Sequence, residues 1–404
     1  MTSINSSKAA NQSIHRVIEV IRAHREVSRR LISKETGLST PSITRLVNEL
    51  MESDVLCVHE STTVDGAGPG RPASVVKLNP LFGCAIGVDV GEHVIQIALG
   101  DMSGKIQLTS RLPTAAETGG NATFANIVRA INDICGIYKS SFEQDAPPLR
   151  AITVGVPGTV DPKTSHIAKA PKINGWTDFD LKGRLESEIP GIAIRIVNDI
   201  NAAATAESAH GVAKGYDNFV FASIRRGIGA GIFINGQLYQ GSAGFAGEMG
   251  KMVFDADFKF SAAEGTGHLE TICGEDPVLD LAIAKGIELE STESSRPRMR
   301  SLATAAANGN QDAIEVLQQF LTNYGLAVAN IASLLDPSII VIGGEIYPVM
   351  DMAVEHLTKT IALLIPSPPK IVGSTLGERA ILQGTYYQAH KDACDTMLVD
   401  QSDS

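Results

Sequence analysis

Two segments of the 404-residue sequence follow one pattern, in which an apolar run meets a glycine turn and returns as a second apolar run. In the first, residues 84–101, the run that ends at Val90 turns at Gly91 and returns to Asp101. The second, "NFVFASIRRGIGAGIFINGQL", spans residues 218–238. Each pattern predicts a strand, a turn and a second strand.

Apolar strands and helices alternate through the chain after residue 80. Residues 151–160 predict a strand that runs into a Gly-Pro turn, and residues 194–207 predict a strand that ends in Asn198 and Asp199 before an alanine-rich helix. Residues 323–345 predict a helix, a turn, an apolar strand and a Gly-Gly loop. This alternation indicates an α/β protein, and the length favours two or three domains. Two strand–turn–strand units with a carboxylate at a strand end are typical of the actin-like, ribonuclease-H-like fold.

Charge is unevenly distributed along the chain, whose formal net charge is −11. Residues 1–80 hold ten Lys and Arg against eight Asp and Glu, a balance of +2, whereas the remainder holds 24 against 37, a balance of −13. This negative net charge argues against a protein whose whole surface is basic and binds nucleic acid. A near-neutral N-terminal segment followed by an acidic remainder is typical of a small nucleic-acid-binding domain attached to a different domain.

A helix-turn-helix is predicted within this N-terminal segment. Residues 12–24 have apolar side chains at helical spacing; a short helix then follows Ser28, and Gly37 ends it. We expect Thr40 to cap a second helix, with Pro41 at its first position. Near its outer, N-terminal end lie side chains suited to a DNA groove: Ser39, Thr40, Ser42, Thr44 and Arg45. The alternative is a pair of ordinary core helices.

A wing follows the two helices. The segments "VLCVHE" and "SVVKLN" alternate like short strands, and the Gly- and Pro-rich stretch 65–72 joins them. Arg71 in "GPGRPAS" stands on a backbone narrow enough for an A·T-rich minor groove. The stretch could equally be a plain loop tip.

Cysteine usage and hydropathy indicate the compartment. The five cysteines are scattered and form no C-x-x-C pair, which favours neither a disulfide framework nor a thiolate metal site. The N-terminus is polar, and no run approaches 18 apolar residues. We therefore expect a cytoplasmic protein with no membrane partner.

The order of these motifs resembles the ROK (repressor, ORF, kinase) family, in particular its transcriptional regulators. The resemblance covers essentially the whole chain and rests on the helix-turn-helix with "GRPA", then "DVG", "GVPG", "NGW", "NDINAAA", "GIGAGIFINGQLYQGSAGFAGEMG" and "IIVIGGE". It implies a winged helix-turn-helix in residues 1–80, followed by a two-lobed sugar-kinase fold. The first lobe would be residues 81–200, joined by a C-terminal helix at about 378–398. The second lobe, residues 201–377, would carry the sugar pocket and a dimer surface.

The resemblance also implies a sugar site. Asp199 matches the catalytic base of the family's kinases, which accepts the proton of the attacking sugar hydroxyl. Asn198, Glu248 and Glu270 match positions that bind sugar hydroxyls, and Gly158 matches a position that lines the same pocket. Carboxylates suit this task because one group can accept two hydroxyl donors. Asp199 could also act as a helix N-cap.

The phosphate loops depart from the family pattern. Where it has Gly-Thr, this chain has Glu92 and His93; where it has Gly-Thr-Gly, this chain has Arg225, Arg226 and Gly227. A carboxylate about 4 Å from a phosphate oxygen costs roughly 4 kcal/mol at an effective dielectric of about 20. We therefore expect no nucleotide cofactor, and we expect Glu92 to pair with Arg225 or Arg226 across the cleft.

The family's zinc-binding element is also altered. The positions of its histidine and three cysteines hold Lys251, Ser261, Ala263 and His268, so at most one ligand remains and no metal is expected. His268 is interpreted as an ordinary loop histidine. Lys251 inherits a position that faces the sugar, where it would bind an acidic group on the ligand or pair with Glu248 or Glu270.

Two classes of function stay open. The first is a transcriptional regulator, a repressor of sugar-metabolism genes, that binds double-stranded operator DNA and responds to a sugar or sugar derivative. The second is an active ATP-dependent sugar kinase with an appended DNA-binding domain. An adaptor whose body docks another protein is compatible with the first. The effector could be a neutral or amino sugar, or else a sugar acid or sugar phosphate. A homodimer or tetramer is expected, because operators usually hold two half-sites.

Overall fold

The computed structural model describes residues 2–61, 73–143, 145–225, 227–255, 267–290 and 299–400. Its N-terminal part is a winged helix-turn-helix, in which three helices precede a two-stranded antiparallel sheet. The elements are α1 (Thr2–His24), α2 (Arg29–Thr36), α3 (Thr40–Glu52), β1 (Leu56–Ser61) and β2 (Ala73–Leu78). The helix-turn-helix and both strands of the wing are therefore confirmed, whereas Arg71 lies outside the described residues.

The turn between α2 and α3 follows from its capping residues. The Ser28 hydroxyl accepts a hydrogen bond from the Leu31 N–H at the start of α2, and Gly37 ends that helix with a left-handed φ of 67°. Ser39, and not Thr40, caps α3, because the Ser39 hydroxyl accepts from the Ser42 N–H. The prediction of Thr40 as the cap was therefore wrong by one residue.

The first α/β lobe is built on a five-stranded sheet in the order β10-β6-β3-β4-β5. Strand β3 pairs antiparallel with β4 and parallel with β6, so the predicted strand–turn–strand unit supplies the central strand of the sheet and one of its neighbours. The strands are β3 (Cys84–Val90), β4 (Val94–Asp101), β5 (Ile106–Pro113), β6 (Leu149–Val156) and β10 (Ala193–Asn198). The lobe also holds α4 (Gly120–Lys139), α5 (Leu181–Glu188) and a small sheet of β7 (Thr159–Val160), β8 (Ile167–Lys169) and β9 (Thr177–Phe179).

The second lobe repeats this topology. Its five-stranded sheet has the order β13-β12-β11-β14-β15, in which β11 pairs antiparallel with β12 and parallel with β14. The strands are β11 (Phe219–Ile224), β12 (Ile228–Ile234), β13 (Gln237–Tyr239), β14 (Ile339–Gly344) and β15 (Lys370–Gly373). Its helices are α7 (His268–Cys273), α8 (Glu275–Ala284), α9 (Met299–Ala307), α10 (Gln311–Leu335) and α11 (Met350–Leu364). Short 3-10 helices lie at Pro80–Phe82, Met249–Lys251, Tyr347–Val349 and Gly377–Arg379.

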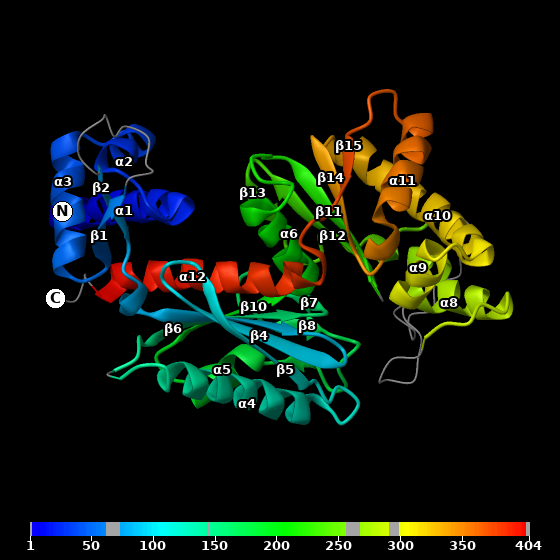
Figure 1. Cartoon of the computed structure of the whole chain (residues 1–404), viewed down its shortest axis with the longest axis horizontal. Coiled ribbons are helices and arrows are strands. Elements are labelled where there is room, and N and C mark those ends of the chain that lie inside the picture. The colour runs from blue at the N-terminus through cyan, green and yellow to red at the C-terminus, as the bar shows by residue number, and fades with distance from the viewer. Residues whose placement is uncertain are drawn as a thin grey trace.

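Two helices join the parts of the molecule: α6 (Asp199–His210) and α12 (Ala380–Asp400). Helix α12 runs along the sheet of the first lobe from the second lobe to the N-terminal domain, with α6 beside it (Figure 1). The helices touch closely, because a Cβ at Gly384 would lie 1.8 Å from the Ala202 carbonyl oxygen. Only glycine permits this approach.

The N-terminal domain packs directly on the body. Val17, Ile21 and Ile43 belong to one buried cluster with Ala393 and Cys394 of α12. Burial of this kind contributes roughly 25 cal/mol for each Å² of apolar surface. The winged helix is therefore attached to the body by packing as well as by the chain. In the described part of the chain, no helix has the length and apolarity needed to cross a membrane.

Candidate functional site: a cavity between the lobes and an exposed helix

A cavity of about 350 Å³ lies between the two lobes. Strand ends and loops of both lobes line it, including Gly91 and Lys172 from the first and Gly229 and Gly247 from the second. All six predicted ligand-binding positions lie on its wall: Gly158, Asn198, Asp199, Glu248, Lys251 and Glu270. The prediction assigned the pocket to the second lobe, whereas the structure builds it from both.

Asn198 and Asp199 lie where β10 ends and α6 begins. The Asn198 side chain caps α6 by accepting from the Asn201 N–H at 3.0 Å, and its amide donates to the Gly158 carbonyl at 3.0 Å. Asp199 is therefore not the N-cap; its Oδ1 accepts from the Ile200 N–H at 2.9 Å. This arrangement fixes the Asp199 carboxylate at the wall of the cavity, at the positive end of a helix.

Arg225 reaches into the cavity from the turn between β11 and β12. Its Nη1 lies 3.8 Å from Asp199 Oδ2, and both residues are half-buried. Glu92 lines the same cavity, but the ion pair that the structure shows for Arg225 is with Asp199. The expected pairing of Glu92 stays a prediction, since Arg226 lies outside the described residues.

Lys251 also lines the cavity and pairs with one of its carboxylates. Its ammonium donates to Glu270 Oε2 at 2.7 Å, and the same oxygen accepts from the Gly267 N–H at 2.9 Å. Lys251 was expected either to bind an acidic group of the ligand or to pair with Glu248 or Glu270, and the structure shows the pair with Glu270. Glu270 is thereby held in place beside Glu248.

Two cations of the cavity escaped the sequence analysis. Lys169 at the end of β8 and Lys172 in the following loop line it, and Lys172 partly offsets the rise that burial causes in the pKa values of Asp199 and Glu248. The local signal was the segment "KAPKINGW". Nothing in that pattern shows that the loop folds over the carboxylates.

Burial governs the acid groups of the cleft. It raises the pKa of Asp89 to about 6, against the opposing effect of Arg225, and it raises the pKa values of Asp199 and Glu248. An acid whose pKa is raised on folding stabilises the fold below its usual pKa, 3.8 for Asp89, and loses this contribution as the pH rises through the folded value. Ionised carboxylates in the cavity therefore cost stability near neutral pH, and hydroxyl donors would offset that cost.

The predicted DNA-facing residues gather on α3 and its turn. Ser39, Thr40 and Arg45 are exposed, while Ser42 and Thr44 are half-buried. Arg45 is 63% exposed and pairs with Glu49 at 2.7 Å, one helical turn away. An exposed pair of this kind contributes little stability, so Arg45 is available to another partner at small cost.

A sequence model described as the ROK family matches residues 85–392, well over half of the chain. The chain belongs to the ROK family. Over 377 residues it is 28% identical to the xylose repressor of Bacillus subtilis (strain 168), covering 92% of this chain and 93% of the repressor. It is 30% identical over 270 residues to a glucokinase of Halalkalibacterium halodurans, covering 65% of this chain and 80% of the kinase.

The fold is also shared with a solved ROK family transcriptional regulator, described as a homolog of the Escherichia coli MLC protein. The two chains superpose with a TM-score of 0.78 at 25% identity, covering 96% of this chain and 98% of the other. Both the winged helix and the two lobes thus have a counterpart in one known structure. The predicted fold class is confirmed.

The zinc element implied by the ROK resemblance does not fit the residues of this chain. The Lys251 ammonium is engaged by Glu270. His268 begins α7 and is buried, and its Nδ1 accepts from the Phe254 N–H at 3.0 Å; its interpretation as a loop residue was therefore wrong. Ser261 and Ala263 lie outside the described residues, but a hydroxyl and a methyl group replace no thiolate.

Proposed function

We propose that the protein is a DNA-binding transcriptional repressor whose kinase-like body senses a sugar. The observation that carries this proposal is the position of Arg225, which extends from a former phosphate loop to the carboxylate of Asp199. The group that would act as a kinase base is thus paired with the protein's own cation. Similarity to a xylose repressor over almost the whole chain supports the same conclusion.

The cavity favours a neutral monosaccharide as effector. Its described lining contains four carboxylates and four cations: Glu92, Asp199, Glu248 and Glu270, with Lys169, Lys172, Arg225 and Lys251. Because the two sets balance, the cavity presents hydrogen-bonding groups of both kinds without a strong net field. Such a site suits a polyhydroxylated ring. A sugar acid or sugar phosphate would compete with the carboxylates for Lys172 and Arg225.

A thermal-shift screen of neutral sugars, amino sugars, sugar acids, sugar phosphates and ATP tests this proposal. We expect a neutral sugar to raise the melting temperature of the full chain and ATP to leave it unchanged, because only a bound ligand stabilises the native state. Stabilisation by ATP, or by phosphosugars alone, would contradict the assignment.

An ATP-dependent sugar kinase is the second candidate, because Asp199 occupies the position of the catalytic base and a glucokinase is among the relatives. We predict no sugar-dependent formation of ADP in the presence of Mg²⁺. Glu92 lines the cavity, and a neighbouring cavity of about 120 Å³ is lined by Glu345 and by Glu378, which pairs with Arg300. The carboxylates of Glu92 and Glu345 oppose a triphosphate. A coupled ADP assay checks this; turnover that requires sugar and disappears in Asp199→Asn would establish the kinase instead.

DNA binding is expected to depend on α3. Arg45→Ala should weaken binding to the natural operator by about 1–3 kcal/mol if Arg45 contacts a base edge, or reduce the salt slope by about one if it contacts a phosphate. The matched control is Lys359→Ala, which removes an equivalent pair, Lys359–Glu355 at 2.5 Å, from α11 of the body. Fluorescence anisotropy over a range of salt concentrations measures both quantities. Equal affinity and slope for Arg45→Ala and wild type would refute the assignment of α3.

The contacts around α6 offer a route from the cavity to the DNA-binding domain. Helix α6 begins at Asp199 in the cavity and ends at His210, whose ring stacks edge-on against Tyr387 of α12 with centroids 5.3 Å apart. On the same Tyr387 ring, the guanidinium of Arg22 from α1 lies 4.8 Å from the centroid. A ligand that draws Asp199 toward it would move α6, and this movement would reach α1 through the contacts of His210 and Arg22 with Tyr387. The ligand can then change DNA affinity only by as much as its own binding free energy differs between the two arrangements of α6 and α1.

Assembly as a homodimer, or a dimer of dimers, belongs to the same proposal. Two winged helices at fixed spacing can occupy the two half-sites of an operator. The ligand would then act by changing that spacing. A monomer in light scattering at micromolar concentration would contradict this part.

A further inference from the structure

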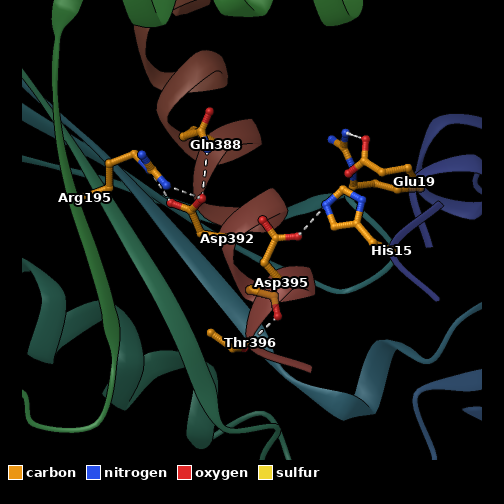
Figure 2. Close-up of polar contacts among 9 residues, drawn as sticks. His15, Glu19, Arg195, Gln388, Asp392, Asp395 and Thr396 are labelled. Atoms are coloured by element: carbon orange, nitrogen blue, oxygen red, sulfur yellow. Dashed lines mark hydrogen bonds and ion pairs between the residues drawn. The ribbon is translucent and has the colours of Figure 1, made fainter. Parts of the chain in front are cut away.

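A histidine and two carboxylates meet where α1 of the DNA-binding domain crosses α12 of the body. His15 and Glu19 are four residues apart on α1, so they share one face of the helix. They face Asp395 near the end of α12 (Figure 2). One ligand atom from each of the three side chains lies within 4.8 Å of the other two.

The spacing of these atoms suits a small divalent cation. His15 Nε2 lies 3.4 Å from Asp395 Oδ1. Zinc bonds to nitrogen and oxygen are about 2.0–2.2 Å long, and tetrahedral geometry then places ligand atoms roughly 3.4 Å apart. His15 and Asp395 are both more than 40% exposed, so an ion can enter from solvent.

Only one of the two carboxylate oxygens of Glu19 accepts a hydrogen bond. Its Oε2 accepts from Arg22 Nη2 at 2.8 Å, which orients the carboxylate. Its Oε1 is buried and has no hydrogen-bond partner among the described residues. A buried carboxylate oxygen without a donor is costly, and a coordinated cation would satisfy it. Arg22 would then act as the outer group that holds a metal ligand in position.

The surrounding charges define the ligand set. Asp392, one turn before Asp395, is already bound to Arg195 through two hydrogen bonds, at 2.6 and 2.9 Å, and it also accepts from Gln388 at 2.9 Å (Figure 2). It is therefore not a ligand. Lys391 opposes a cation at this place, whereas Asp392 adds negative charge beside Asp395. The three carboxylates Glu19, Asp392 and Asp395 are balanced by Arg22, Lys391 and Arg195, so attraction of a cation depends on direct coordination by the three ligands.

We propose that His15, Glu19 and Asp395 form a site for a divalent transition-metal ion of the zinc type, which fastens the DNA-binding domain to α12. Imidazole nitrogen with carboxylate oxygens is a donor set that zinc accepts, and water would complete the coordination. Because the ligands come from both domains, the bound ion resists any movement of α1 relative to α12. Resting on the proposed function, the consequence is that the metal restrains the change by which the sugar alters DNA binding.

Isothermal titration of the full-length protein, first stripped with EDTA, with zinc chloride tests the site directly. We expect one equivalent of zinc to bind wild type, and to bind His15→Ala and Asp395→Asn at least about tenfold more weakly. The matched control is His24→Ala. It removes another His–carboxylate pair of the same domain, His24–Glu35 at 2.8 Å, which has no third ligand in the cluster described here.

Zinc taken up by other groups, such as the cysteine thiols, should appear equally in all four proteins. Zinc should also raise the melting temperature of wild type and His24→Ala, and not that of the two ligand variants. Equal zinc affinity and stoichiometry in wild type and His15→Ala would overturn the proposal, as would an equal loss in His24→Ala. Zinc binding is measured without DNA or sugar. The metal site can therefore be refuted while the proposed regulatory function is upheld, and the regulatory function can be refuted while the metal site is upheld.

Discussion

Asp199→Asn is expected to weaken effector binding by about 10- to 150-fold, because a hydrogen bond to a charged group contributes about 1.5–3 kcal/mol. The substitution keeps the shape of the side chain and removes its charge. It also leaves Arg225, 3.8 Å away in the native protein, facing a neutral amide. Calorimetry with the sugar identified in the thermal-shift screen measures the loss.

The control for this experiment is Asp178→Asn, which neutralises a carboxylate that is 89% exposed and belongs to the first lobe. Its affinity for the sugar should match that of wild type. Lys251→Met then separates the ligand classes: a neutral sugar should lose little affinity, whereas an anionic ligand that uses this ammonium should lose most of it. Wild-type affinity in Asp199→Asn would mean that the effector binds elsewhere.

The strand and helix pattern was predictable because its signals are local. Gly91 and Gly227 stand between apolar runs, and each run became a strand of a repeated five-stranded sheet. The N-cap of α3 was missed by one position, since Ser39 and Thr40 are neighbouring residues that both favour capping. Only the φ/ψ angles of the chain distinguish them.

The polar contacts of the cavity were less predictable, because they depend on the paths of separate loops. The family pattern placed Asp199 and Glu270 at the cavity, and the structure brings them there. It could not show that Arg225 reaches Asp199, since this contact joins two lobes. Lys172 was missed for the same reason: its position relative to Asp199 is set by the fold of an irregular segment.

The junction between domains has no local signal at all. His15 and Glu19 resemble the polar face of any surface helix, and Tyr387 lies in a C-terminal helix with no capping or turn motif near it. His15 of α1 and its partner Asp395 are more than 300 residues apart in the sequence. His210 and Tyr387 are almost 180 residues apart. Such contacts follow only from the packing of α12 against both α6 and α1.

Tyr387→Ala is expected to uncouple the sugar from DNA. Tyr387 is the aromatic ring that His210 of α6 and Arg22 of α1 share, with distances of 5.3 Å between ring centroids and 4.8 Å to the guanidinium. Without it, movement of α6 no longer reaches α1 through this contact. Couplings of this kind change affinity about 5- to 150-fold, and we expect the variant to retain only a small part of the wild-type factor.

The measurement is operator affinity with and without saturating sugar, together with sugar affinity in the absence of DNA. Sugar affinity should stay within about twofold of wild type, because Tyr387 lies outside the cavity lining. Tyr347→Ala is the matched control: Tyr347 also lies under an arginine, Arg300 at 5.1 Å, but in the second lobe. If Tyr387→Ala keeps the full response of DNA affinity to sugar, α6 is not the route, and the lobes must act on α1 through the sheet of the first lobe instead.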